Sequence, residues 1–216
     1  MPVISDRAIS ILIGFEISSP AYYETHLSHP VWPGGASGVT LGIGYDLGEH
    51  TVQQVTEDWS PHLDDQSLAL LLTVAGVRGN AANERVYELS GILVPFAAAQ
   101  AVFSTSTLPQ FADDTAKAVP KCDELSGDSF GALVSLSYNR GAGGFTRMDD
   151  RYIEMREITA AMVQGRFSAV PGFIRQMKRI WQDADGKPLP GCAGLLTRRD
   201  AEADLFEGGL APPLIA

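Results

Sequence analysis

Basic side chains are scarce in this chain of 216 residues. Sixteen lysines and arginines stand against 26 acidic residues, which gives a formal net charge of −10. Duplex nucleic acid is therefore excluded as an expected partner, because binding its phosphates requires a basic stripe. Two interpretations of the acidic surface stay open: a simply solvated surface, or a face that docks a carrier or an inhibitor.

Long apolar runs are also absent. No stretch approaches the ~20 apolar residues that a membrane span needs. The apolar segment Ile9 to Ile13 follows Asp6 and Arg7 and lacks the basic leader and cleavage site of an export signal. We therefore expect synthesis in the cytoplasm without a signal peptide, and no membrane insertion. Any substrate outside the cell would then require a delivery route.

Cysteine and histidine are rare. Cys122 and Cys192 lie far apart in no metal-like spacing, so they are either two free thiols or one disulfide formed in an oxidising compartment. The four histidines form no metal signature, and we interpret them as loop or surface residues. We expect no metal ion and no other cofactor.

Helical periodicity dominates what the chain does contain. A first helix is expected from Ser5 or Asp6 to about Glu16, where Ser18-Ser19-Pro20 stops it. The later expected helices are Thr51 to Asp58, one opened by Asp64 and Asp65, Pro95 to Phe103, one capped by Ser126 and ended by Gly141, Arg151 to Gln164, Gly172 to Trp181, and Leu196 to Phe206.

One strand-like segment interrupts this helical pattern. Residues Val39 to Leu47 alternate in polarity, and their glycines suit a tight hairpin. The stretch before it, Ala21 to Ser37, carries several proline and glycine breakers and is expected to be irregular. The sequence therefore predicts an α+β fold that is mainly α, with one small sheet near the N-terminus.

Two carboxyl groups flanking the scissile bond are the normal requirement of glycoside hydrolysis. Glu16 suits the acid, because partial burial beside Phe15 and the negative helix end both favour a protonated carboxyl. Thr40 and Asp46 are six residues apart, so in regular strand geometry they share a face on which they could hold a water. Taken singly, a solvated helix-end glutamate, a strand-forming threonine and a turn aspartate remain alternatives.

These residues belong to an ordered set of motifs that resembles the phage-type lysozymes. That family has a glutamate ending the first helix, a T-x-G-x-G hairpin, a central helix and a closing helix. The matching segments here, which are spread over most of the chain in the family's order, are Glu16, Gly38 to Gly48, Ala132 to Gly141 followed by Gly144-Phe145-Thr146, and Gly194 to Glu202.

One departure from the phage pattern concerns the second carboxylate. The phage enzymes place an aspartate before the hairpin, but no aspartate lies between Glu16 and Thr40 here. An aspartate directly after the hairpin, as Asp46 is, is similar to the pesticin-like branch, which comprises muramidase toxins of bacteria. That resemblance implies Glu16, Thr40 and Asp46 as the catalytic set, with Glu24 as the alternative to Asp46.

The resemblance also implies supporting residues. A closing-helix arginine lies beside the catalytic glutamate in the family, so Arg198 or Arg199 is expected there, where it would favour the ionised carboxyl and oppose the effect of burial. A surface basic pair is the alternative. Tyr45, Tyr138 and Asn139 are candidate substrate-binding residues, with a core tyrosine and a helix-end asparagine as the alternatives.

The implied fold is a single lysozyme-like domain over residues 1–216. A lobe of about 1–60 would carry the hairpin, and a helical lobe of about 61–210 would complete a two-lobed protein. The implied activity is that of a muramidase, which hydrolyses the β-1,4 bond between N-acetylmuramic acid and N-acetylglucosamine in peptidoglycan strands. A water held by Thr40 and Asp46 favours inversion, for which the two carboxyl groups are roughly 6.5–9.5 Å apart.

Other functions remain open from the sequence. The same fold type serves chitosanases and chitinases, and a non-catalytic wall-binding module belongs to a further class. The expected monomer would act in the periplasm or at the cell wall after delivery. It would be either an endolysin released through a phage holin, or a toxin delivered by a type VI secretion system, with a secretion carrier and an immunity protein as partners.

Overall fold

The computed structural model describes residues 2–210, and its contacts divide the chain into two compact units. Unit 2 holds residues 16–109, and unit 1 holds the described residues before and after that range. This differs from the division expected near residue 60, because later segments pair with the region of the hairpin. The amide of Gly76 donates to the carbonyl of Leu47 (2.9 Å), and that of Val94 donates to Ser28 (2.8 Å).

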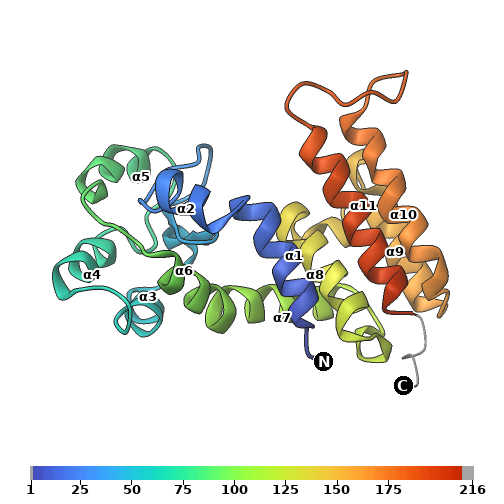
Figure 1. Ribbon diagram of the computed structural model, residues 1–216, viewed down its shortest axis with the longest axis horizontal. Coiled ribbons are helices and arrows are strands. Elements are labelled where there is room, and N and C mark those ends of the chain that lie inside the picture. Colours follow the sequence, from blue (N-terminus) through green and yellow to red (C-terminus); the bar gives the residue numbers. More distant parts are fainter. Residues whose placement is uncertain (1, 211–216) are drawn as a thin grey trace. The chain divides into compact units, whose positions relative to one another are not determined.

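Unit 2 consists of short helices around a minimal sheet (Figure 1). The chain enters it in the last turn of α1 and leaves it in the first turn of α7. Its elements in between are α2 (Pro20–His26), β1 (Thr40–Leu41), β2 (Tyr45–Asp46), the 3-10 turn η1 (Leu47–Glu49), α3 (Val52–Trp59), α4 (Asp65–Leu72), α5 (Asn80–Arg85), the 3-10 turn η2 (Val86–Leu89), α6 (Phe96–Val102) and the π-helical turn η3 (Phe103–Thr107).

Helix α2 corrects the expectation of an irregular chain from Ala21 onward. Ser18 has a φ of 60° and ends α1, as expected from the Ser-Ser-Pro sequence. The same residues then start a new helix, since the Ser19 side chain accepts a hydrogen bond from the amide of Tyr22 and Pro20 occupies the first turn. Proline suits that position because its missing N–H has no partner there in any case.

The expected hairpin is present and very short. Strands β1 and β2 pair antiparallel, with Thr40 opposite Asp46 and Leu41 opposite Tyr45. Gly42 and Gly44 turn the chain between them with φ angles of 61° and 68°, a region that residues with a Cβ rarely adopt. The hairpin is thus built from the two glycines that the T-x-G-x-G pattern provides.

The elements of the described part of unit 1 are helices and helical turns, apart from an isolated bridge between Gln182 and Pro188. Its elements are α1 (Asp6–Ile17) up to Phe15, most of α7 (Leu108–Ala118), the 3-10 turn η4 (Cys122–Glu124), α8 (Gly127–Arg140), the 3-10 turns η5 (Ala142–Phe145) and η6 (Asp150–Tyr152), α9 (Ile153–Val163), η7 (Phe167–Ala169), α10 (Val170–Gln176), η8 (Met177–Trp181) and α11 (Ala193–Gly208).

Helix α8 is the central element of unit 1. Every residue from Ser129 to Ser137 is buried, so the helix is enclosed on all sides as its apolar sequence predicts. Helix α11 packs on α8 and on α10, and α9, α10 and α11 lie side by side (Figure 1). The expected fold class, mainly α with one small antiparallel sheet in residues 2–210, is confirmed. No helix in this range is long and apolar enough to span a bilayer.

Candidate active site

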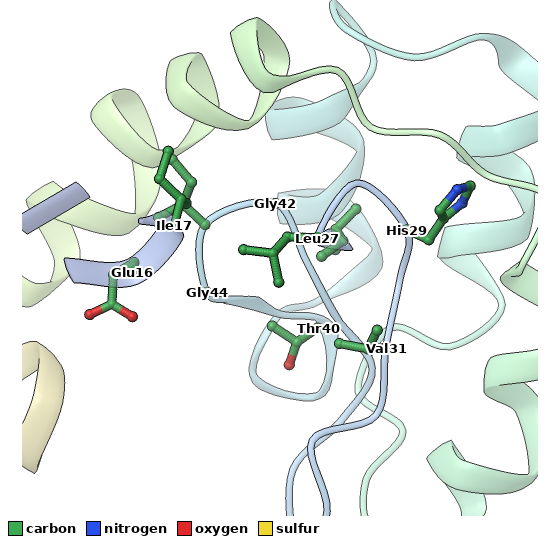
Figure 2. A pocket seen from close by; sticks show the side chains of 10 residues that line it. Glu16, Ile17, Leu27, His29, Val31, Thr40, Gly42 and Gly44 are labelled. Carbon is green, nitrogen blue, oxygen red and sulfur yellow. The ribbon is translucent and has the colours of Figure 1, made fainter. Parts of the chain in front are cut away.

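A cavity of about 170 Å³ in unit 2 brings Glu16 and Thr40 together. Its wall runs from the last turn of α1 through the segment after α2 to the hairpin. In Figure 2, Glu16 lies beside Ile17 and Thr40 lies beside Val31. Glu16 and Thr40 are both half-buried, so each residue is only partly shielded from solvent. The full lining is Glu16, Ile17, Leu27, His29, Val31, Thr40, Leu41, Gly42, Ile43 and Gly44.

Most of this lining is apolar. Ile17, Leu41 and Ile43 are each only 2% exposed, and they form a wall that belongs to the core of unit 2. Leu27 and Val31 complete it from the segment after α2. The sequence patterns did not indicate these two residues, because helix α2 was not expected, although Ser19-Pro20 is a usable signal for its start.

Asp46 does not line the cavity, and its carboxylate is bound by the backbone. Its Oδ1 accepts hydrogen bonds from the amides of Gly48 (2.8 Å) and Gly38 (3.0 Å), and Oδ2 lies 3.2 Å from the Gly38 nitrogen. Asp46 also caps the 3-10 turn η1. Its half-buried side chain therefore holds the base of the hairpin.

Gly38 is essential to this arrangement. A Cβ placed on it would lie 2.3 Å from the Gly48 nitrogen and 2.5 Å from Asp46 Oδ1, closer than real contacts allow. The Asp46 carboxylate thus requires glycine at this position, which explains why the motif begins with Gly38.

Two other candidates in unit 2 have structural partners. Glu24, the alternative second carboxylate, is exposed and accepts a hydrogen bond from the amide of Phe96 (3.0 Å), so it caps α6. Tyr45 is 1% exposed, and its hydroxyl donates to Asp58 Oδ2 (2.7 Å). Burial raises the pKa of the Tyr45 hydroxyl, and the hydrogen bond to Asp58 acts in the same direction. Tyr45 is thus a core tyrosine and does not line the cavity.

The two arginines of the closing helix lie inside unit 1. Arg198 is 4% exposed and Arg199 is fully buried, so the alternative of a surface basic pair is wrong. The Arg199 Nη2 donates to Glu202 Oε1 (2.7 Å), as does the Arg198 Nε (3.1 Å), and Arg198 Nη2 also donates to the carbonyl of Ser135 (3.1 Å). Burial lowers the pKa of Arg199 to about 10, although the charge of Glu202 raises it.

Comparison with protein families finds a match for the region that contains helices α8 and α11. Residues 94–202, half of the chain, match the family described as Phage lysozyme. The chain belongs to the phage lysozyme family. Residues 13–126 match a second family, described as Domain of unknown function (DUF8812), and the chain belongs to that family as well. No curated protein matches the chain.

The two family matches divide the candidate residues of this phage lysozyme family member. Tyr138, Asn139, Arg198 and Arg199 lie within the phage lysozyme match, on α8 and α11. Glu16, Thr40, Tyr45 and Asp46 lie in the DUF8812 match and precede residue 94. Membership of the lysozyme family implies a glycoside hydrolase that acts on peptidoglycan.

Tyr138 and Asn139 lie at the end of the central lysozyme helix and are half-buried. The ring of Tyr138 packs against Phe111 with 4.6 Å between ring centroids. The Asn139 Oδ1 is buried and accepts no hydrogen bond from the described residues. No cluster of His, Cys, Asp and Glu in residues 2–210 is arranged to hold a metal ion.

Proposed function

We propose that the protein is a muramidase that hydrolyses the β-1,4 bond between N-acetylmuramic acid and N-acetylglucosamine, with Glu16 as the catalytic acid. The observation that carries the proposal is the shared cavity of Glu16 and Thr40 in a chain of the phage lysozyme family. A half-buried carboxyl beside an apolar wall is suited to donating a proton to the leaving oxygen.

In the proposed reaction, Thr40 and Asp46 act on the water. Their direct opposition across the hairpin supports this pairing, because opposed side chains of an antiparallel pair lie on one face. Thr40 holds the water through its hydroxyl, and Asp46 supplies the second carboxylate. The attack from the face opposite Glu16 then inverts the anomeric configuration. Identification of the first anomer released tests this step, and a retained configuration contradicts it.

The apolar wall favours N-acetylated sugars over chitosan. Ile17, Leu41 and Ile43 offer no partner for an ammonium group, and burying an unpaired charge is costly. An acetamido methyl or a lactyl methyl group is neutral and gains from burial against such residues. The chitosanase alternative is therefore the less favoured of the two glycosidase functions.

The test is the identity of the products. Purified peptidoglycan, chitosan and N-acetylated chitooligosaccharides are incubated with the protein, and soluble fragments are reduced and identified by mass. The proposal expects fragments from peptidoglycan that end in reduced muramic acid. Fragments ending in reduced glucosamine derivatives, or products from chitosan alone, contradict it. Binding to walls without any product would support a wall-binding module instead.

We further propose that the protein acts in the wall compartment after delivery, within the pesticin-like branch of muramidase toxins. The position of Asp46 supports that branch, and the net charge of −10 supports a delivered effector, because an acidic protein gains little from attraction to an anionic wall.

The test is to direct the chain to the periplasm of a Gram-negative host. Lysis there but not after cytoplasmic expression is expected. Rescue by a protein encoded beside it would identify an immunity partner, and lysis only with a co-expressed holin would favour an endolysin.

A further inference from the structure

The carboxylate of Asp58 joins three parts of unit 2. Its Oδ2 accepts hydrogen bonds from the Tyr45 hydroxyl (2.7 Å) and from the Ser106 hydroxyl (2.8 Å). Asp58 itself belongs to α3, Tyr45 to strand β2 and Ser106 to the π-helical turn η3. A hydrogen bond to a carboxylate is generally stronger than one between two neutral groups. Asp58 is thus a shared anchor between the hairpin and two elements that lie outside it.

The ring of Tyr45 packs against residues at the base of the hairpin. It stacks on His50 with 3.9 Å between ring centroids and meets Trp59 edge-on at 5.4 Å. The His50 Nδ1 lies 2.7 Å from the carbonyl oxygen of Asp46, the residue next to Tyr45. The side chain of Tyr45 therefore has little freedom to move unless the strand moves with it.

The π-helical turn places the second hydroxyl. Segment Phe103–Thr107 lies between α6 and α7, and such wide turns are rare and are frequently found at functional sites. The hydroxyl of Ser106 donates to Asp58, whereas those of Ser104 and Thr105 donate to carbonyls of α6. The π-helical turn thus places the hydroxyl of Ser106 as a hydrogen-bond donor to Asp58, the residue that also binds Tyr45.

We propose that Asp58 is a positioning residue for the reaction, which acts through Tyr45 to fix the hairpin that carries Thr40 and Asp46. Each strand of that hairpin has only two residues, so the position of the hairpin depends on contacts outside its own ladder. Thr40 has one such contact in its antiparallel bridge to Val31. The Asp58 network supplies a second restraint, on the strand that carries Asp46. Tyr45 accordingly acts through the hairpin and not through contact with sugar. This inference rests on the proposed function for its kinetic consequence only.

Tyr23 provides a matched control within the same unit. It is also fully buried, and its hydroxyl also donates a hydrogen bond, to the carbonyl of Val94 (3.1 Å), but none of its partners belongs to the hairpin. Tyr45→Phe and Tyr23→Phe each remove one buried hydroxyl and keep the ring. Similar shifts in Tm are therefore expected, whereas the effect on the site is expected from Tyr45→Phe alone.

The experiment combines kinetics with amide hydrogen exchange. Tyr45→Phe should lower kcat on peptidoglycan about tenfold with KM unchanged, because a small misplacement of a reacting group is costly. It should also speed exchange of the Thr40 and Leu47 amides, which donate to Val31 and Val39. Asp58→Ala should act like Tyr45→Phe, Asp58→Asn should restore part of the loss by keeping an acceptor, and the double variant should lose no more than either single one.

Equal kcat and equal hairpin exchange in Tyr45→Phe and Tyr23→Phe would overturn the proposal, since the Tyr45 network would then be ordinary core packing. A fall in kcat accompanied by a matching rise in KM would assign Tyr45 to substrate binding and would also overturn it. Failure of the proposed function has a different signature. The wild type would then release no fragments from any glycan, while the exchange comparison would still decide whether Asp58 fixes the hairpin.

Discussion

Thr40 and Asp46 are direct partners across the two-residue strands of the hairpin, so their side chains emerge on the same face of the sheet. Their even spacing in the sequence predicted that the two side chains share a face. They do so because a turn at Gly42 to Gly44 places them opposite each other on two strands. Thr40 lines the cavity with Glu16, whereas Asp46 binds the backbone at the base of the hairpin.

Asp46→Asn separates the catalytic role of this carboxylate from its capping role. An amide oxygen at the place of Oδ1 can still accept from Gly38 and Gly48, so the fold should change little. We expect fragment release to fall at least about a hundredfold, the scale of general acid–base catalysis. Asp46→Ala should in addition lower the free energy of unfolding by about 1 kcal/mol through the lost cap. An active Asp46→Asn enzyme would leave Asp46 with a structural role only.

Thr40 is tested by keeping or removing its hydroxyl. Thr40→Ser retains the hydroxyl and should keep most of the activity, whereas Thr40→Val keeps the shape and should lower kcat by about tenfold or more. Neither change should alter the Tm greatly, because Thr40 is half-buried at the rim of a cavity. Equal kcat values for the two variants, measured on purified peptidoglycan, would remove Thr40 from the reaction.

Sequence patterns within a few residues predicted most of the helices and the hairpin of this fold. They did not predict the polar contacts between segments that lie far apart in the sequence. Ser126, Thr51 and Asp64 cap helices as expected, since capping depends on neighbours within three residues. Helix α2 was missed because a Ser-Pro pair both ends one helix and starts the next. The hydrogen bond of Tyr45 to Asp58 joins positions 13 residues apart and follows no periodicity.

For the candidate site, the sequence predicted the hairpin of the T-x-G-x-G motif but not the contacts that its residues make. The T-x-G-x-G pattern placed Thr40 in a glycine-turned hairpin, because positive φ angles require glycine. It did not reveal that the carboxylate of Asp46 accepts from two backbone amides, or that Arg198 and Arg199 are buried around Glu202. Both facts depend on how segments pack, which sequence spacing does not encode.

Glu202 should be the most sensitive charge of unit 1. It is fully buried and is the acceptor for both Arg198 and Arg199, so Glu202→Gln removes the buried charge that both guanidinium groups contact. We expect a loss of about 3–5 kcal/mol in the free energy of unfolding. Glu207→Gln on the same helix is the control, because its exposed pair with Arg175 should contribute no more than about 1 kcal/mol. Chemical denaturation of both variants gives the comparison, and equal losses would contradict the buried network.

The two cysteines should differ in reactivity. Both are free thiols, and burial raises the pKa of Cys122 to about 11. Because the thiolate is the reactive form, Cys122 should stay protonated and unreactive from pH 7 to 9 in the folded protein. A thiol reagent at pH 8 should label the half-buried Cys192 alone, and Cys122 only after unfolding. The Cys192→Ser variant, which should take up no label when folded, provides the control.

The buried thiol of Cys122 also gives a stability prediction with a defined sign. Its pKa is higher in the folded than in the unfolded protein, so between about pH 9 and 11 the unfolded state binds fewer protons. The contribution of Cys122 to stability is therefore complete at neutral pH and is lost as the pH rises through that window. Cys122→Ala should make the free energy of unfolding less dependent on pH there, and an unchanged pH dependence would contradict the raised pKa.

Glu16 is the centre of the account, and its substitution is the most direct test. Wild type and Glu16→Gln are compared for the release of soluble fragments from purified peptidoglycan, with wall binding and Tm measured on the same preparations. The account predicts that Glu16→Gln stays folded and binds walls but releases no fragments, because the proton donor is lost. Fragment release by folded Glu16→Gln at a rate close to that of the wild type would contradict the assignment of Glu16 as the catalytic acid.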